Sequence, residues 1–543
     1  MKYLLLFIFL YGHAVVAQKL KKSDRVIIEN LNKDIGFLAS DQLEGRGTGT
    51  PGEELAYKYI ADKFKTIGLI PKGENDTYLQ QFEVNDGKRV LPSTRLMINE
   101  TSLDYGSDFF PFIFSAEKSL KTDASPALRE KGRPWFWDIK DLAAENKNNP
   151  HFDLDNAIRS KAREFSDKGA TAVIVYDTGG ETEEPEFRPK EKAEVLNIPV
   201  LFLKNNAAKK YFSDPTSNLD IDINVALADS VRRGHNILGY IDNGAPETII
   251  LGGHYDHLGY GEDHNSLWTG ARSIHNGADD NASGTAAVIE LARLIKNSKL
   301  KNKNYLFISF SGEELGLFGS KYFTDHPTVD LGSVDYMINA DMVGRLNDST
   351  HALFIGGYGT SPSWGTILNP NTKIFQVKFD SSGIGPSDHT SFYLKNIPVL
   401  FFFTGTHKDY HKPSDDVDKI NFLGELQVIN YIYSIIERTN KMDKLVFSKT
   451  KEPKMDSPHF TVTLGIMPDY TFSGNGVKAD AVIDGKIADR AGIKGGDVIT
   501  KLGDYQTIDL NSYMEALGRF KKGDAARVSI LRGTSPMTFD IVF

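Results

Sequence analysis

Short apolar runs alternate with longer amphipathic segments between residues 234 and 439. The runs have the length and composition of buried strands, and they lie at 248–253, 304–310, 334–341 and 397–403. Apolar residues recur at helical spacing in two further segments, 283–297 and 422–438. Such a repeated order of strand, loop and helix is typical of α/β domains. The pattern therefore predicts a central, mostly parallel mixed sheet flanked by helices.

The residues before this domain predict two helices within 25–72. The glycine-rich stretch LEGRGTGTPGEE at 43–54 separates them, and Pro51 falls near the start of the second helix. The stretch 90–230 differs, because it is rich in charge, proline and aromatic residues. It predicts a helix at 157–170 and strands at 170–176 and 197–203, without a cluster of catalytic residue types. We interpret 90–230 as a compact α+β insertion.

A chain of 543 residues is too long for a single core. A lysine-rich linker precedes a last unit, in which 510–520 predicts a helix. We predict a signal peptide at 1–17, a catalytic domain in two segments at 24–89 and 231–440, the insertion at 90–230, the linker at 441–455 and a carboxy-terminal domain at 456–543.

The first residues have the pattern of a secretory signal. Lys2 precedes an apolar run from Tyr3 to Leu10, and the small residues Val15 and Ala17 predict cleavage after Ala17. This run is too short to span a bilayer, and no later run approaches spanning length. We expect a secreted or periplasmic chain without an integral membrane segment after cleavage. An uncleaved membrane anchor is the alternative.

Composition restricts the chemistry. The 63 basic and 72 acidic residues give a net charge of −9, which argues against a nucleic acid partner because phosphate binding usually shows as a basic excess. The sequence contains no cysteine, which excludes disulfides, a cysteine nucleophile and thiolate metal ligands. Any metal site must therefore be built from His, Asp and Glu.

Acidic residues and histidines follow the predicted strands. They are His254 and Asp256, Asp279 and Asp280, Glu313 and Glu314, Asp341, and His411. Ligands of open α/β sheets bind outside the carboxyl ends of the strands, so we expect these side chains to converge on one edge. Taken singly, Asp280 could cap a helix, the glutamates could face solvent, and His254 could simply hydrogen-bond to Asp256. Together they favour a metal site, since so many carboxylates would repel one another without a cation.

The ligand types indicate the metal. Mixed imidazole and carboxylate ligands favour zinc, with manganese or cobalt as tolerable substitutes. Two histidines, one shared aspartate and two further carboxylates fit a clamp for two metal ions with an open position for water. The remaining glutamate can then act as general base, which is what amide hydrolysis requires.

The order of the motifs resembles that of the di-zinc aminopeptidase family, which includes bacterial leucyl aminopeptidases and glutamate carboxypeptidase. H-x-D, D-D-N-x-S-G, G-E-E, N-A-D and Y-H follow one another, and the resemblance covers residues 24–108 and 230–440. It implies the zinc-aminopeptidase fold, two zinc ions as cofactors, and peptides as substrates.

The resemblance also implies a role for each motif residue. Asp280 would bridge the two ions, and it is chosen over Asp279 because it lies four residues before Gly284, as in the family. The implied metal ligands are His254 and Asp341 at one ion, Glu314 and His411 at the other, and Asp280 at both. The implied catalytic residues are Glu313 as the base, Asp256, which orients His254, and Tyr410, which steadies the tetrahedral oxyanion.

Other polar residues near these motifs have ordinary interpretations. The segment GPSDHTSFY at 385–393 resembles a family segment near the substrate pocket, so Asp388 and His389 either contact substrate or make structural hydrogen bonds. We interpret three histidines that lie near the site in sequence as solvated loop residues: His257, His264 and His275.

The accessory units resemble known modules. KAREFSDKGATAVIVYD within 90–230 resembles a protease-associated domain, which in the family shapes substrate access. TLGI and AGIKGGDVI in the last unit resemble a PDZ domain, with Leu464–Ile466 as its carboxylate-binding loop. Such a domain binds a peptide terminus by adding it as a strand. The alternative is that it packs against the catalytic domain and binds nothing.

These resemblances together imply a secreted metallo-aminopeptidase that hydrolyses the amino-terminal peptide bond. The nearest alternative is a carboxypeptidase acting on acidic dipeptides. A glutaminyl cyclase would keep the fold with one zinc, and a catalytically silent binding protein would act through its accessory domains. The complete ligand set and the paired glutamates favour hydrolysis over the last two.

Overall fold

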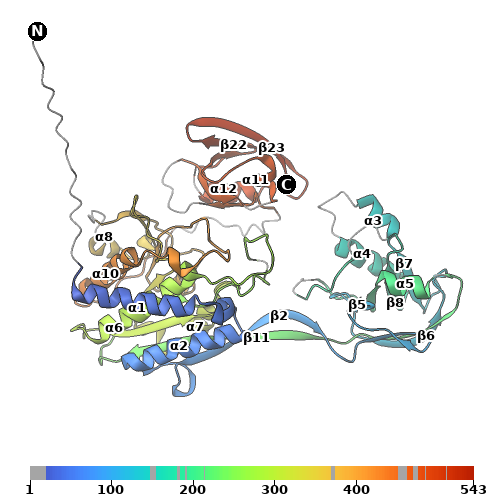
Figure 1. The fold of residues 1–543 in the computed structure, drawn as a ribbon, viewed down its shortest axis with the longest axis horizontal. Coiled ribbons are helices and arrows are strands. Elements are labelled where there is room, and N and C mark those ends of the chain that lie inside the picture. Colours follow the sequence, from blue (N-terminus) through green and yellow to red (C-terminus); the bar gives the residue numbers. More distant parts are fainter. Residues whose placement is uncertain are drawn as a thin grey trace, which may run out of the picture. The chain divides into compact units, whose positions relative to one another are not determined.

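A computed structural model describes residues 20–146, 154–179, 184–189, 193–212, 214–263, 265–368, 374–450, 462–468, 475–482, 485–508 and 510–543. The predicted signal peptide and His264 lie outside the described residues. The chain divides into two compact units, one formed mainly by 1–81 and 234–518 and the other mainly by 82–233 (Figure 1). The predicted insertion at 90–230 lies within the second unit.

The first unit is built on a nine-stranded sheet. Its strands are β1 (Ile70–Pro71), β2 (Leu79–Val90), β11 (Leu227–Ile241), β12 (Thr248–His254), β13 (Asn304–Phe310), β14 (Val334–Ala340), β15 (Ala352–Gly356), β16 (Gln376–Phe379) and β17 (Val399–Phe403). They are ordered β1-β11-β13-β12-β14-β17-β15-β16, and β2 pairs with β11. The four central strands β13, β12, β14 and β17 are parallel, whereas β11 and β15 are antiparallel to their central neighbours. The predicted mostly parallel mixed sheet is confirmed.

The apolar runs form the central strands because both faces of the sheet are covered. Every residue of β12, β13, β14 and β17 is buried, as expected for parallel strands between two layers of helices. Alternate residues of β12 point to opposite faces, so Ile249 and Leu251 join one apolar cluster and Ile250 joins another.

Helices of the first unit cover the two faces of this sheet. They are α1 (Lys22–Leu38), α2 (Pro51–Ile67), α6 (Gly284–Lys296), α7 (Phe318–Asp325), α8 (Trp364–Ile367), α9 (His389–Tyr393) and α10 (Phe422–Thr439). Helices α1, α2, α6 and α10 contribute to the cluster that contains Ile249, and α7 and α9 to the cluster that contains Ile250. No helix among the described residues has both the length and the apolar character needed to cross a membrane.

Helix α2 illustrates how local sequence sets the boundaries. The Thr50 hydroxyl accepts a hydrogen bond from the Glu53 N–H, and Pro51 occupies the first turn, where no intrahelical N–H bond is lost. The helix ends at Gly68, whose φ of 82° is the left-handed conformation that glycine adopts without strain. The predicted glycine-rich break therefore precedes a helix capped at both ends.

The second unit contains two four-stranded sheets. The strands are β3 (Arg95–Ile98), β4 (Thr101–Ser102), β5 (Phe109–Pro111), β6 (Ser119–Ala124), β7 (Pro134–Asp138), β8 (Ala172–Tyr176), β9 (Val200–Leu203) and β10 (Leu219–Asn224). One sheet has the order β4-β3-β10-β6 and the other β5-β9-β8-β7. The helices are α3 (Lys140–Asn146), α4 (Leu154–Asp167) and α5 (Asn205–Tyr211). Its resemblance to a protease-associated domain stays a prediction.

The carboxy-terminal residues form a smaller sheet with two helices. The elements are β18 (Ile466–Pro468), β19 (Val477–Val482), α11 (Ile487–Ala491), β20 (Val498–Leu502), β21 (Tyr505–Gln506), α12 (Leu510–Leu517), β22 (Ala525–Arg532) and β23 (Ser535–Val542). In the predicted carboxylate-binding loop, Leu464 is buried and its carbonyl accepts the N–H of Ala488, next to the start of α11.

A buried glutamate in α10 makes the fold sensitive to pH. Glu425 is fully buried, and neither carboxylate oxygen has a hydrogen-bond partner among the described residues. Burial, followed by the nearby carboxylates Asp279 and Asp34, raises its pKa well above the ordinary value. The folded chain therefore holds a proton there that the unfolded chain releases, so stability falls as pH rises from the unfolded-state pKa toward the folded-state pKa.

We expect Glu425→Gln to remove this pH-dependent loss. At pH 7 the variant should unfold at a higher temperature, by about 2–4 °C for each kcal/mol gained, and the difference should vanish near pH 4. Thermal scans by circular dichroism from pH 4 to 8, in the presence of chelator, measure this difference in unfolding temperature. Glu437→Gln, an exposed change on the same helix, is the control. Equal pH dependence in both variants would contradict the assignment.

Candidate metal and catalytic site

The predicted ligands converge at the carboxyl edge of the central strands. His254 ends β12, Asp341 directly follows β14, and Glu314 lies four residues after β13. Asp280 lies in the short helical segment η3 (Ala278–Ser283) that leads into α6, and His411 lies in the loop after β17. Parallel strands end at the same edge of a sheet, which is why residues distant in sequence meet here.

Two groups of ligand atoms share Asp280. In the first group, the His254 Nε2 atom lies 3.4 Å from Asp280 Oδ1 and 3.5 Å from Asp341 Oδ1. In the second, the His411 Nε2 atom lies 3.2 Å from both Asp280 Oδ2 and Glu314 Oε2. Asp280 thus presents one oxygen to each group.

These distances fit zinc. Ligand atoms about 2.0–2.1 Å from one tetrahedral zinc ion lie about 3.3 Å apart, which is close to the separations in both groups. The Oδ2 atom of Asp280 is buried and has no hydrogen-bond partner among the described residues. A buried carboxylate oxygen without a donor is costly unless a cation faces it. Imidazole and carboxylate are also the donor types that zinc prefers.

Glu313 lies beside the first group. Its Oε2 atom is 3.9 Å from His254 Nε2, and its backbone N–H donates to Asp256 Oδ1 at 3.2 Å. Burial raises the pKa of Glu313 well above its usual range; His254 opposes the shift, whereas Glu314 and Asp341 reinforce it. With a side chain that is 11% exposed, Glu313 does not face solvent.

Asp256 orients His254 mainly through its backbone. The His254 Nδ1 atom lies 3.1 Å from the Asp256 carbonyl oxygen and 3.6 Å from its carboxylate. The fully buried carboxylate accepts the Thr48 hydroxyl at 3.0 Å as well as the Glu313 N–H. The side chain thus connects the imidazole, the backbone of Glu313 and the glycine-rich segment.

Tyr410 is half-buried next to the second group, and its ring stacks on His411 with centroids 3.9 Å apart. Burial, followed by the charges of Asp280 and Glu314, raises the pKa of Tyr410 well above its ordinary value. The phenol stays protonated at neutral pH and keeps a proton to donate.

The two adjacent aspartates have different surroundings. Asp279 Oδ1 accepts the Gly344 N–H at 2.7 Å and the Ser283 hydroxyl at 3.0 Å, and its Oδ2 faces His407 Nε2 at 3.2 Å. Asp280 instead faces His254 and His411, the two histidines predicted as ligands. Asp279 is therefore held by hydrogen bonds away from both groups, which supports the choice of Asp280 as the shared ligand.

The segment 385–393 holds Asp341 in place. The Ser387 hydroxyl donates to Asp341 Oδ2 at 2.7 Å and accepts the side-chain N–H of Asn339 at 2.7 Å. Asp388 and His389 are buried, and His389 stacks on Phe401 with centroids 4.6 Å apart. Both carboxylate oxygens of Asp388 and the Nδ1 atom of His389 have no hydrogen-bond partner among the described residues, so the role of both residues stays a prediction.

Two histidines that we interpreted as solvated are buried, so that interpretation is wrong for both. His275 is 1% exposed and bonds through its two ring nitrogens to the Ser266 hydroxyl at 2.7 Å and the Ser273 carbonyl at 3.0 Å. His257 is 2% exposed and lies 2.7 Å from Glu314 Oε1. Their loop folds back over the site, which no local sequence pattern indicates.

Comparisons with known proteins identify the domain that carries these residues. Residues 236–433 match the model of peptidase family M28, and residues 461–542 match that of a PDZ domain. Residues 236–433 form a peptidase family M28 domain. The predicted family, the peptidase class of enzyme and the carboxy-terminal PDZ domain are confirmed.

Relatives extend over more of the chain. Aminopeptidase YwaD of Bacillus subtilis is 27% identical over 421 residues, which cover 73% of this chain and 84% of the relative. Aminopeptidase Y of Saccharomyces cerevisiae is 22% identical over 458 residues, which cover 74% of this chain and 76% of that relative. Among solved structures, the zinc aminopeptidase BSAP from Bacillus subtilis matches with a TM-score of 0.43 and 21% identity over 77% of this chain and 98% of that one.

A buried arginine ties the glycine-rich segment to the site of the M28 domain. Arg46 is 0% exposed and ends the short helical segment η1 (Asp41–Arg46). Its guanidinium donates to four backbone carbonyls, those of Leu38, Tyr255, Asn276 and Gly277. Burial lowers its pKa to about 10, while Asp280 and Asp256 oppose the shift, so it stays protonated at neutral pH. The sequence predicted that the glycine-rich stretch separates two helices, and nothing in it singled out Arg46.

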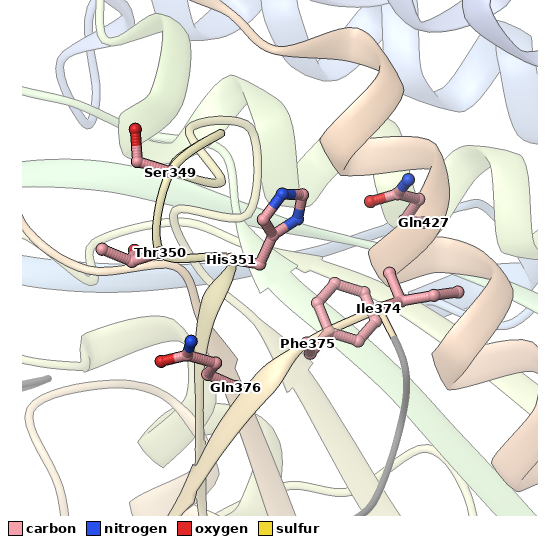
Figure 2. Close-up of a pocket in the computed structure, with 7 residues that line it drawn as sticks. All are labelled: Ser349, Thr350, His351, Ile374, Phe375, Gln376 and Gln427. Carbon is pink, nitrogen blue, oxygen red and sulfur yellow. The ribbon is translucent and has the colours of Figure 1, made fainter. Parts of the chain in front are cut away.

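A cavity of about 390 Å³ elsewhere in the M28 domain shares no residue with the metal-ligand groups. Figure 2 shows its lining: Ser349, Thr350, His351, Ile374, Phe375, Gln376 and Gln427. Among the described residues that line it, His351 is the only titratable side chain and none is a carboxylate. These residues do not supply the charged groups that peptide hydrolysis needs.

We expect Arg46→Met to destabilise the M28 domain by about 3 kcal/mol or more, because four buried carbonyls lose their donors. Urea denaturation in chelator, followed by circular dichroism, measures the change. Lys58→Met is the control, since Lys58 makes only an exposed pair with Glu54 in α2. A loss at Arg46 no larger than that at Lys58 would refute the structural role.

Proposed function

We propose that this chain is an exported two-zinc aminopeptidase, which removes residues from the amino termini of peptides. The observation that carries the proposal is Asp280, which presents one buried oxygen to each of two groups with zinc-like spacing. Glu313 stands beside them as a carboxylate that neither group requires. The family match and the aminopeptidase names of the relatives support the same activity.

Different residues of the chain have different roles in the proposed reaction. Zinc, when bound, polarises a carbonyl group and lowers the pKa of water. Glu313 removes a proton from the attacking water and delivers it to the leaving amine nitrogen as the peptide bond breaks. Tyr410 donates a hydrogen bond to the oxyanion that forms at the attacked carbonyl. Asp256 and Ser387 fix His254 and Asp341, so the site needs little reorganisation.

We infer export from the basic and apolar pattern of residues 2–17. The PDZ domain supports binding of a peptide terminus, because such domains add an extended peptide to a sheet edge. We propose that the insertion is a protease-associated domain that shapes substrate access. The substrates are then peptides rather than nucleic acids.

A substrate panel separates this proposal from its alternatives. The purified protein is incubated with aminoacyl-nitroanilides, acidic dipeptides blocked at the amino terminus and amino-terminal glutaminyl peptides, with chelator and then with added zinc. We expect cleavage of the nitroanilides that chelator abolishes and zinc restores. Cleavage of the blocked dipeptides alone would indicate a carboxypeptidase, and cyclisation of glutaminyl peptides a cyclase. No turnover with two zinc ions bound would indicate a binding protein.

The adjacent glutamates provide a matched pair of variants. We expect Glu313→Gln to bind two zinc ions but to lower kcat by about 10²–10⁴-fold, because the proton acceptor is lost. Glu314→Gln removes a ligand charge instead, so it should lose one zinc ion. Activity assays beside zinc content after dialysis distinguish the two effects. A Glu313→Gln protein with unchanged kcat would rule out Glu313 as the base.

A further inference from the structure

His257 has no role in the site described above, yet its side chain is fully enclosed by it. The His257 Nδ1 atom lies 2.7 Å from Glu314 Oε1 and 3.8 Å from Asp280 Oδ2. The other Glu314 oxygen, Oε2, faces His411 Nε2 at 3.2 Å. Each oxygen of this carboxylate therefore has its own imidazole, and the two rings lie 5.9 Å apart at an angle of 74°.

Distance separates a metal ligand from a hydrogen-bond donor. His257, Asp280 and Glu314 are near enough together to hold a metal ion. Two ligand atoms on one tetrahedral zinc ion lie about 3.3 Å apart, however, and His411 meets that spacing. The 2.7 Å between His257 Nδ1 and Glu314 Oε1 is shorter and is that of a charge-assisted N–H···O bond.

The other ring nitrogen indicates where the proton resides. His257 Nε2 is buried and has no hydrogen-bond partner among the described residues. A proton on Nε2 would leave a buried donor unpaired, whereas a proton on Nδ1 is used by Glu314. The surroundings therefore favour a proton on Nδ1, which donates to Glu314.

The backbone fixes the ring in this orientation. The His257 N–H donates to the carbonyl of the buried Arg46 at 3.3 Å. The ring also packs against Gly277, whose φ is 56°, so closely that a Cβ atom there would lie 2.4 Å from the ring Cδ2. The imidazole is thus held between two segments, and Glu314 is held by it.

We propose that His257 is a positioning residue, which holds Glu314 by an Nδ1–H···Oε1 bond so that Oε2 faces the second metal position. The proposal rests on the metal site of the proposed function and deepens it. It makes the two metal positions unequal, because the ligand carboxylate of the first, Asp341, is held by a serine hydroxyl and that of the second by an imidazole.

The test uses a matched pair of variants in the full-length protein. In His257→Asn, the side-chain N–H₂ is attached to Cγ, as Nδ1 is in histidine, and can still donate to Glu314. His257→Leu has nearly the shape of asparagine without the donor. Zinc binding to the metal-free proteins is measured by titration against a competing chromophoric chelator. Thermal unfolding of the metal-free proteins reports whether both variants fold.

We expect His257→Leu to weaken one of the two zinc-binding steps by about 10–100-fold and to leave the other nearly unchanged, whereas His257→Asn keeps most of the affinity. Equal affinity in all three proteins would overturn the proposal. Equal loss in both variants would overturn it too, since it would mean that the imidazole is a ligand or only fills space. Zinc binding is measured without substrate, so a chain that shows the expected pattern but cleaves no peptide refutes the proposed activity alone.

Discussion

Repulsion between buried carboxylates is the constraint on which this site depends. Asp256, Asp279, Asp280, Glu313, Glu314, Asp341 and Asp415 meet at one edge of the sheet, and most of them are almost wholly buried. Like charges interact strongly where water is excluded, so each carboxylate must be neutralised, hydrogen-bonded or paired with a cation. The surrounding fold can be understood as the way these charges are compensated.

The acids fall into two sets according to their partners. Asp256, Asp279 and Asp415 each accept at least one backbone N–H, and Asp415 accepts those of Asp279 and Asp280. These hydrogen bonds use the carboxylates to fix the conformation of the loops that carry the N–H donors. Asp280, in contrast, has no hydrogen-bond donor at its buried Oδ2 oxygen among the described residues. A buried carboxylate oxygen without a donor, placed between two groups of zinc-like spacing, is where a metal ion is expected.

Sequence patterns predicted the parts of this structure that depend on local chemistry. The strand β13 matched its predicted range, 304–310. A continuous apolar run of this length is stable only where both of its faces are buried, as they are in the centre of the sheet. The convergence of the acidic residues and histidines that follow the strands could be predicted because parallel strands end at the same edge of a sheet. The choice between Asp279 and Asp280 could not come from spacing alone, since both precede α6. The Gly344 N–H and the His407 ring that face Asp279 are distant from it in sequence.

Burial of loop residues was the part that the sequence could not predict. His257 lies in a polar loop, where exposure is the ordinary expectation, and its partner Glu314 is 57 residues away. Arg46 lies in the glycine-rich stretch between two helices, yet its guanidinium binds backbone carbonyls from three separate segments of the chain. Both residues matter through contacts that exist only after the loops close over the sheet edge. The predicted ligands of this site follow from its motifs, but the groups that would orient them follow from the three-dimensional fold.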